Sequence, residues 1–237
     1  MQFIDTHIHL QDYKSKNAPQ IPDAAVVKFV CISAWEADWE SVGKLAQAFP
    51  QAVVPAFGLH PWYLAEALPG WEERLRARLQ AFPRALIGEC GLDRLKNPAA
   101  EPQQQAFAAH IRLAAELKRP LLVHAVKAQD WLEKFWPQLQ GVRFVLHSFG
   151  GSAEFMRRAL RFGAYISFAP PVCCRKNFAE LASSVPADKL LLESDGPYQG
   201  QPAEVPALLL QLAACRGEPA EQLAARIYQN SQEFINV

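Results

Sequence analysis

Neither sign of charge is in excess in this sequence. Its 24 lysine and arginine residues balance 24 aspartate and glutamate residues, so the formal net charge at pH 7 is zero. Such a chain has no overall positive field to attract nucleic acid, and any contact with a polyanion must be local.

Cysteines and long apolar runs are also scarce. The five cysteines are an odd number without C-x-x-C spacing, which predicts reduced thiols in the cytoplasm. No window approaches the roughly 18 uninterrupted apolar residues of a membrane span. The first residues have neither a basic segment nor a long apolar run, so no signal peptide is predicted. We expect a cytoplasmic protein without a membrane contact, and nothing indicates an obligate protein partner.

Repeats, low-complexity tracts and Gly/Ser linkers are absent as well, which predicts one domain over residues 1–237. No glycine-rich phosphate fingerprint follows the first apolar run, and this disfavours a dinucleotide-binding fold.

What the sequence does contain is an alternation of short apolar runs and helical patterns. The predicted strands are Phe3–His9, Val26–Ser33, Val53–Gly58, Ala85–Glu89, Pro120–His124, Arg143–His147, Ala164–Phe168 and Leu190–Asp195. The predicted helices are Asp38–Phe49, Trp71–Phe82, Pro102–Lys118, Gln129–Leu139, Ala153–Phe162, Phe178–Ser184, Val205–Cys215 and Ala220–Phe234. Continuous apolar strands between helices are typical of buried parallel sheets. Eight such units predict an α/β fold, either a (β/α)8 TIM barrel of about 250 residues or a doubly wound sheet.

Residues able to bind a metal ion stand at the ends of five predicted strands. His7 and His9 flank Ile8, so their imidazoles share one face of the first strand, about 7 Å apart. The other strand ends carry Glu89, His124, His147 and Asp195. Barrel enzymes build their sites at the carboxyl ends of the strands, so six such side chains predict one metal centre there.

Four imidazoles and two carboxylates without a thiolate suit Zn²⁺, Mn²⁺, Mg²⁺ or Fe²⁺. A central carboxylate suits a bridge between two ions, which together polarise a phosphoryl oxygen and activate water. Asp195 is placed to orient or deprotonate that water. The predicted catalytic residues are therefore Asp195 and Glu89.

Several motifs resemble the TatD family of metal-dependent hydrolases. They are D-T-H-I-H-L (Asp5–Leu10), G-L-H-P (Gly58–Pro61), G-E-C-G-L-D (Gly88–Asp93), P-L-L-V-H (Pro120–His124), H-S-F-G-G (His147–Gly151) and E-S-D-G-P-Y (Glu193–Tyr198). The resemblance runs from residue 5 to the C-terminus. It implies a TIM barrel, two divalent ions (Zn, Mg or Mn) and cleavage of phosphodiester bonds in DNA or oligonucleotides. The family's ligand positions fall on His7, His9, Glu89, His124, His147 and Asp195, with Glu89 as the bridge.

Two alternatives stay open. The same site would also suit an amidohydrolase acting on a small amide, lactone or phosphate ester, and a metal-binding barrel without turnover is the third possibility. The neutral charge favours the small-molecule alternative. So does Val126, which stands where the family commonly has an arginine.

Substrate-binding candidates lie beside the metal ligands. The resemblance implies that His60 lies near the substrate phosphate or an extra metal, although it is equally compatible with a loop histidine bonded to backbone. Lys127 and Arg175 are the predicted cationic contacts to phosphate, although Arg175 also suits a solvated surface. Trp62 and Tyr63 suit stacking on a base or packing within their loop. Glu193 suits a position behind the ligands, where it holds an imidazole N–H.

Overall fold

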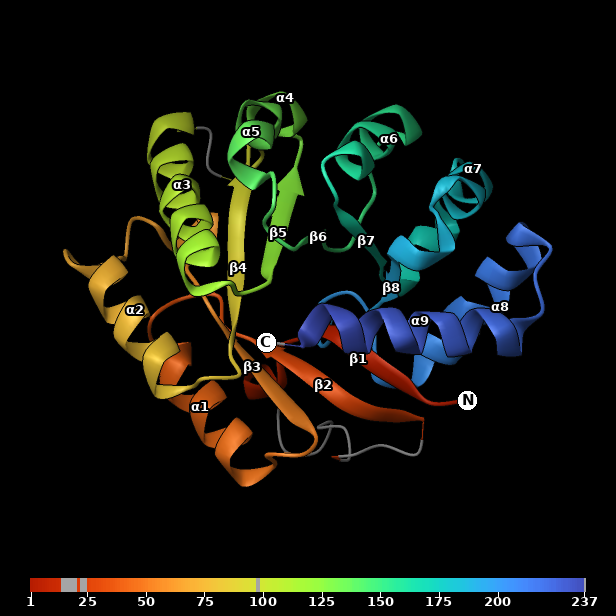
Figure 1. Ribbon diagram of the computed structural model, residues 1–237, viewed down its shortest axis with the longest axis horizontal. Coiled ribbons are helices and arrows are strands. Elements are labelled where there is room, and N and C mark those ends of the chain that lie inside the picture. The colour runs from red at the N-terminus through yellow and green to blue at the C-terminus, as the bar shows by residue number, and fades with distance from the viewer. Residues whose placement is uncertain (14–20, 22–24, 97–98, 237) are drawn as a thin grey trace.

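The structure is a computed structural model and describes residues 1–13, 21, 25–96 and 99–236. The described chain forms one sheet of eight strands whose spatial order is their sequence order, and every neighbouring pair in that sheet is parallel. The strands are β1 (Phe3–Ile8), β2 (Val26–Ile32), β3 (Val53–Phe57), β4 (Leu86–Asp93), β5 (Leu121–Val126), β6 (Phe144–Leu146), β7 (Tyr165–Phe168) and β8 (Leu190–Leu192). The ends of the sheet meet at a parallel bridge between Ile8 and Gly196, which nearly closes a barrel (Figure 1).

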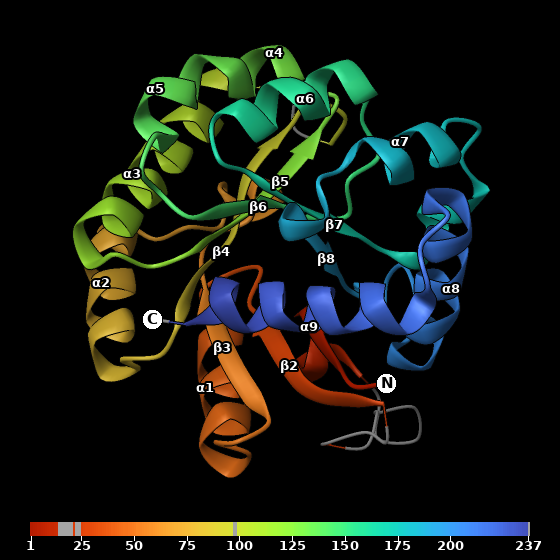
Figure 2. The ribbon, with the colours of Figure 1, turned by 45° about the vertical axis from the view of Figure 1, so that its right-hand side comes forward.

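Helices surround this sheet, as Figures 1 and 2 show. They are α1 (Asp38–Ala48), α2 (Trp71–Ala81), α3 (Ala100–Leu117), α4 (Gln129–Leu132), α5 (Trp136–Leu139), α6 (Ala153–Arg161), α7 (Phe178–Ser184), α8 (Val205–Arg216) and α9 (Ala220–Ile235). The alternation of strands and helices confirms the predicted (β/α)8 barrel. Within the described residues, no helix is both long enough and apolar enough to cross a membrane.

The barrel has an apolar floor and a polar upper layer. The floor is one buried cluster of side chains from seven strands, joined by Phe234 of α9: Val30, Ile32, Val54, Ala56, Leu86, Leu122, Val145, Tyr165, Leu191 and Phe234. Phe234 is fully buried, so α9 closes the amino-terminal end of the barrel. Because side chains on a strand alternate, the residue two places beyond each floor residue also points inward, nearer the carboxyl end. His124 follows Leu122 in this way, and Glu193 follows Leu191.

Three predicted elements differ clearly from the structure. The strand predicted over Leu190–Asp195 ends at Leu192, so Asp195 lies in the loop that follows β8. Strand β4 does not end at Glu89 but continues to Asp93, with a register shift between Ile87 and Cys90. Gly91 permits this continuation, because its φ is +141° and a Cβ there would lie 2.0 Å from the carbonyl oxygen of His124. The predicted helix over residues 129–139 is broken into α4, a 3-10 turn and α5, where Pro137 stands in the first turn of α5 and lacks the N–H that a continuous helix needs.

Candidate metal centre and active site

All six predicted ligands meet at the carboxyl end of the barrel, and Glu89 stands at their centre. Its Oε2 lies 3.3 Å from His7 Nε2 and 3.5 Å from His9 Nε2. Its Oε1 lies 2.9 Å from His147 Nε2, 3.1 Å from His124 Nδ1 and 3.3 Å from His60 Nε2. One carboxylate oxygen therefore faces each of two groups of imidazoles.

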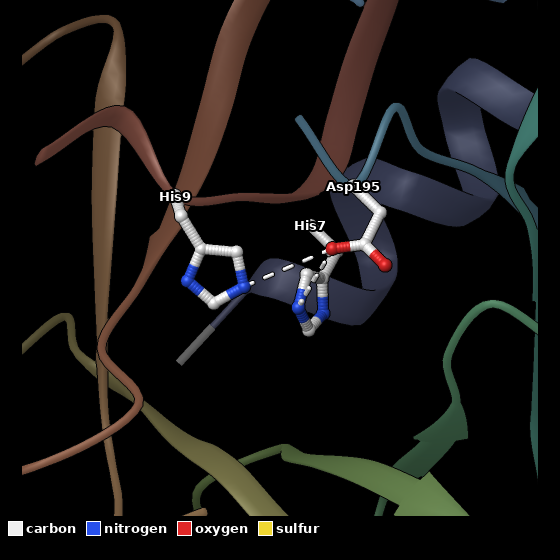
Figure 3. A group of neighbouring side chains, drawn as sticks. All are labelled: His7, His9 and Asp195. Atoms are coloured by element: carbon white, nitrogen blue, oxygen red, sulfur yellow. Dashed lines mark ion pairs between the residues drawn. The ribbon is translucent and has the colours of Figure 1, made fainter. Parts of the chain in front are cut away.

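The first group lies where the two ends of the sheet meet. Figure 3 shows the imidazoles of His7 and His9 directed at one carboxylate oxygen of Asp195, at 3.9 and 3.8 Å. His7 and His9 come from β1 and the residue that follows it, whereas Asp195 lies three residues beyond β8. The other oxygen of Asp195 accepts a hydrogen bond of 2.5 Å from Gln199 Nε2, which fixes the carboxylate plane.

The second group contains His124 and His147, and each of these imidazoles has a carboxylate behind it. His124 Nε2 lies 3.0 Å from Asp93 Oδ2, and His147 Nδ1 lies 3.4 Å from Glu193 Oε1. A carboxylate facing a ring nitrogen favours the tautomer that carries its proton on that nitrogen. The opposite nitrogens, His124 Nδ1 and His147 Nε2, then present lone pairs to the interior of the site.

These two lone pairs and Glu89 Oε1 form a triangle of acceptors. Its sides are 3.3 Å between the two nitrogens and 3.1 and 2.9 Å from them to the oxygen. Three acceptors at such distances repel one another unless positive charge lies among them, either as protons on the imidazoles or as a metal ion that replaces those protons. Ligands bonded to one ion at about 2.0–2.1 Å are separated by roughly 2.9–3.4 Å in tetrahedral or octahedral geometry. The triangle therefore fits a divalent ion.

A second observation supports the fit in the first group. The Nε2 atom of His7 is buried and makes no hydrogen bond to any residue that the structure describes, although it faces Glu89. A buried polar nitrogen without a partner is costly, and an ion would satisfy it.

The pKa values of Glu89 and His147 also indicate a site that attracts positive charge. Burial alone would raise the pKa of Glu89, but the surrounding imidazoles hold that pKa well below its usual range. Burial pulls the pKa of His147 down, yet the Glu89 carboxylate overrides it and holds that pKa well above the usual value. Glu89 therefore remains an anion that gathers positive charge around itself.

His60 differs from the other histidines around Glu89. Its Nδ1 accepts a hydrogen bond of 3.2 Å from the backbone N–H of Trp62, and burial lowers its pKa to about 4. The neutral ring must then carry its proton on Nε2, the atom that faces Glu89. His60 thus presents a donor to the site where its neighbours present lone pairs, which suits an oxygen of a substrate better than a metal ion.

Lys127 and Arg175, the other predicted substrate contacts, lie beside the centre rather than in it. Both are exposed, and both line a cavity of about 250 Å³ that shares His124 and His147 with the ligand set. A separate cavity of about 210 Å³ lies over the ligands and is bordered by Trp62, Tyr63 and Tyr198.

Asp93 is a site residue that the sequence analysis missed. Its Oδ2 faces His124 and also accepts a hydrogen bond of 2.7 Å from the indole of Trp62. Its Oδ1 accepts from the backbone N–H groups of Leu95 and Lys96. The signal was present, because Asp93 is the last residue of G-E-C-G-L-D, but the strand was expected to end four residues earlier. Glu193 lies behind His147, as predicted for a residue that supports an imidazole.

A parallel barrel with buried histidines and carboxylates gathered at the carboxyl ends of its strands defines a metal-dependent hydrolase. The family model for TatD related DNase matches residues 4–236. The chain belongs to the TatD family.

Individual relatives agree with this assignment. The chain is 33% identical to the 3′-5′ ssDNA/RNA exonuclease TatD of Pantoea vagans, with 94% of each chain covered. It is 33% identical to the protein of the same name from Escherichia coli K12, with 82% of each covered. Among solved structures, YJJV, a TatD homologue from Escherichia coli K12, superposes with a TM-score of 0.89 at 25% identity, covering 99% of this chain and 98% of that one.

Proposed function

We propose that the chain is a 3′-5′ exonuclease that removes nucleotides from single-stranded DNA or RNA, the activity named for its exonuclease relatives. Membership of the TatD family makes it a metal-dependent hydrolase of phosphodiester bonds. The observation that carries the proposal is the position of Glu89, with one carboxylate oxygen facing each group of imidazoles. Small-molecule amidohydrolases match the chain only distantly in fold.

The chain would hold two divalent ions, which are Zn, Mg or Mn. His7, His9 and Asp195 would hold one, and His124 with His147 would hold the other. The oxygens of Glu89 would join the two positions. When bound, such ions polarise a phosphoryl oxygen and lower the pKa of water to about 7.

Other side chains would act on the substrate and on water. Asp195 would accept the proton of the attacking water as general base, and its oxygen is oriented for this by Gln199. His60 would donate from Nε2 to a phosphate oxygen. Trp62 and Tyr198 are 41% and 66% exposed at the mouth of the site, where they would stack on unpaired bases.

A labelled oligonucleotide tests this function. A single-stranded DNA of about 20 nucleotides, and the matching RNA, would be incubated with Mg²⁺, Mn²⁺ or Zn²⁺. We expect a 3′-terminal label to be released first as a mononucleotide and a 5′-terminal label to move down a ladder. A chelator should stop release, and excess metal should restore it. Release that starts from the 5′ end, or a hydrolysis rate on small esters far above that on the oligonucleotide, would contradict the proposal.

Asp93→Asn tests the support behind His124. The change keeps the shape of the side chain but removes the charge that fixes the His124 tautomer. We expect metal affinity and kcat/KM each to fall about 10- to 100-fold, as is usual for a partner behind a metal ligand. Metal titration and initial rates measure this. Asp130→Asn is the control, since that carboxylate is exposed and pairs with Arg94. Unchanged metal affinity in the Asp93→Asn protein would show that Asp93 does not support metal binding through His124.

A further inference from the structure

A second cavity adjoins the metal centre and differs from it in charge. It shares His124 and His147 with the centre, and its volume is about 250 Å³. The cavity over the ligands is bordered by aromatic side chains, whereas this one is bordered by Lys127 and Arg175. No aspartate or glutamate is among the described residues that line it. In a chain of zero net charge, two cations without a carboxylate make a local preference for anions.

Arg175 is held at this cavity by the backbone of Gly150. Its Nη2 donates a hydrogen bond of 2.6 Å to the carbonyl oxygen of Gly150. The guanidinium also lies against the Cα of Gly150, since a Cβ there would be only 2.6 Å from Cζ and from Nη2. A guanidinium has five N–H donors, so one bond to a carbonyl orients the group and leaves the others for a ligand.

Lys127 lines the same cavity. It follows β5 directly and has a φ of +51°, a left-handed conformation that is unfavourable for a residue with a Cβ. That conformation turns the chain at the carboxyl end of β5, three residues after His124. The two cations thus come from different parts of the chain: Arg175 is held by the carbonyl of Gly150, and Lys127 stands at the turn that follows β5.

We propose that this cavity is a second phosphate subsite, which binds the phosphate next to the scissile one in a single strand. The inference rests on the proposed nuclease function. It explains how the site would bind an oligonucleotide strand rather than a single phosphodiester. Lys127 and Arg175 contact the neighbouring phosphate, while the scissile phosphate lies at the metal centre between His124 and His147. The bases on the other side meet the aromatic wall formed by Trp62, Tyr63 and Tyr198.

The test is the salt dependence of binding by the metal-loaded protein. The probe is a fluorescent tetrathymidylate with phosphorothioate linkages, measured by anisotropy between 50 and 300 mM salt. For single strands, log K falls as log salt rises, and each lost phosphate contact makes this negative slope shallower by about 0.7. We expect Lys127→Ala and Arg175→Ala each to lose about that much slope and to bind about tenfold more weakly. Arg157→Ala, an exposed arginine that does not line the cavity, is the matched control and should match the parent protein.

Gly150→Ala separates position from charge. The new Cβ overlaps the end of a flexible side chain, so the protein should fold while the guanidinium moves away. We expect it to weaken binding as Arg175→Ala does, although it removes no charge. An unchanged slope in Arg175→Ala, or an equal loss in Arg157→Ala, overturns the subsite.

A second substrate distinguishes this inference from the proposed function. The p-nitrophenyl ester of thymidine 5′-phosphate carries one phosphate and cannot reach a second subsite. We expect the ratio of kcat/KM on a tetranucleotide to kcat/KM on this ester to fall about tenfold in Arg175→Ala. If the parent protein hydrolyses neither substrate, the nuclease function fails. If it hydrolyses both and the ratio does not change, only the subsite fails.

Discussion

Replacing Glu89 with glutamine is expected to reduce kcat/KM by at least about 10³-fold. Glutamine has nearly the same shape, but it is neutral and presents one oxygen and one NH₂ group. Whichever way the amide turns, the NH₂ faces either His7 and His9 or His124 and His147. One group of imidazoles would therefore face an NH₂ in place of an oxygen, and the whole site would lose the negative charge that would hold the ions. A bound ion would supply several kcal/mol of transition-state stabilisation, and each 1.36 kcal/mol is worth a factor of ten.

Metal content and initial rates check this result. We expect the Glu89→Gln protein to retain less metal after dialysis than the parent protein does. Circular dichroism and thermal unfolding would show that the barrel is intact. Glu116→Gln is the control because this exposed glutamate pairs with Arg76 on the outside of the barrel. A Glu89→Gln protein that keeps both its metal and its rate would disprove the central role of Glu89.

The second large effect is expected for Asp195→Asn, with a loss in kcat of about 10²- to 10⁴-fold, the range of general acid–base catalysis. Gln199 donates to Asp195 Oδ2, and Gln199 Oε1 in turn accepts from the hydroxyl of Ser148. Asparagine would keep the bond to Gln199 by turning its oxygen outward. Its NH₂ would then face His7 and His9, where a base and a ligand are needed.

Asp188→Asn provides a matched control for that variant. Asp188 is exposed just before β8, at the opposite end of the strand from Asp195. Single-turnover rates at saturating metal would separate the chemical step from weaker metal binding. Equal rates for Asp195→Asn and Asp188→Asn would show that Asp195 does not act as the base.

The positions of the ligands were predictable because strand geometry has a period of two residues. His124 lies two residues beyond Leu122 of the apolar floor, so its inward direction follows from the sequence alone. The same rule places Glu193 on the inward side after Leu191, whereas Asp195 lies beyond β8 with a φ of +51°, outside the alternation of the strand. Buried parallel strands are also easy to recognise, which is why the barrel was predicted correctly.

Asp93 and the triangle of acceptors could not be predicted in this way. Asp93 reaches the site only because Gly88 and Gly91 let β4 continue through a change of register, and a pattern of residue types does not encode register. Which nitrogen of His124 points inward depends on a carboxylate contact across two strands. Such contacts are known only once the strands are placed side by side.

Because β1 pairs with the chain beyond β8, one metal position can be completed only late in the synthesis of the protein. His7 and His9 are among the first ten residues to be made and Asp195 follows His9 by 186 residues, and one ion would require all three. During synthesis, His7 and His9 therefore lack their partner Asp195 until most of the chain has been made. Ion loading would come after the barrel has closed, and its binding free energy would then be added to the stability of the finished protein. A chain that stops before residue 195 would lack that contribution to its stability.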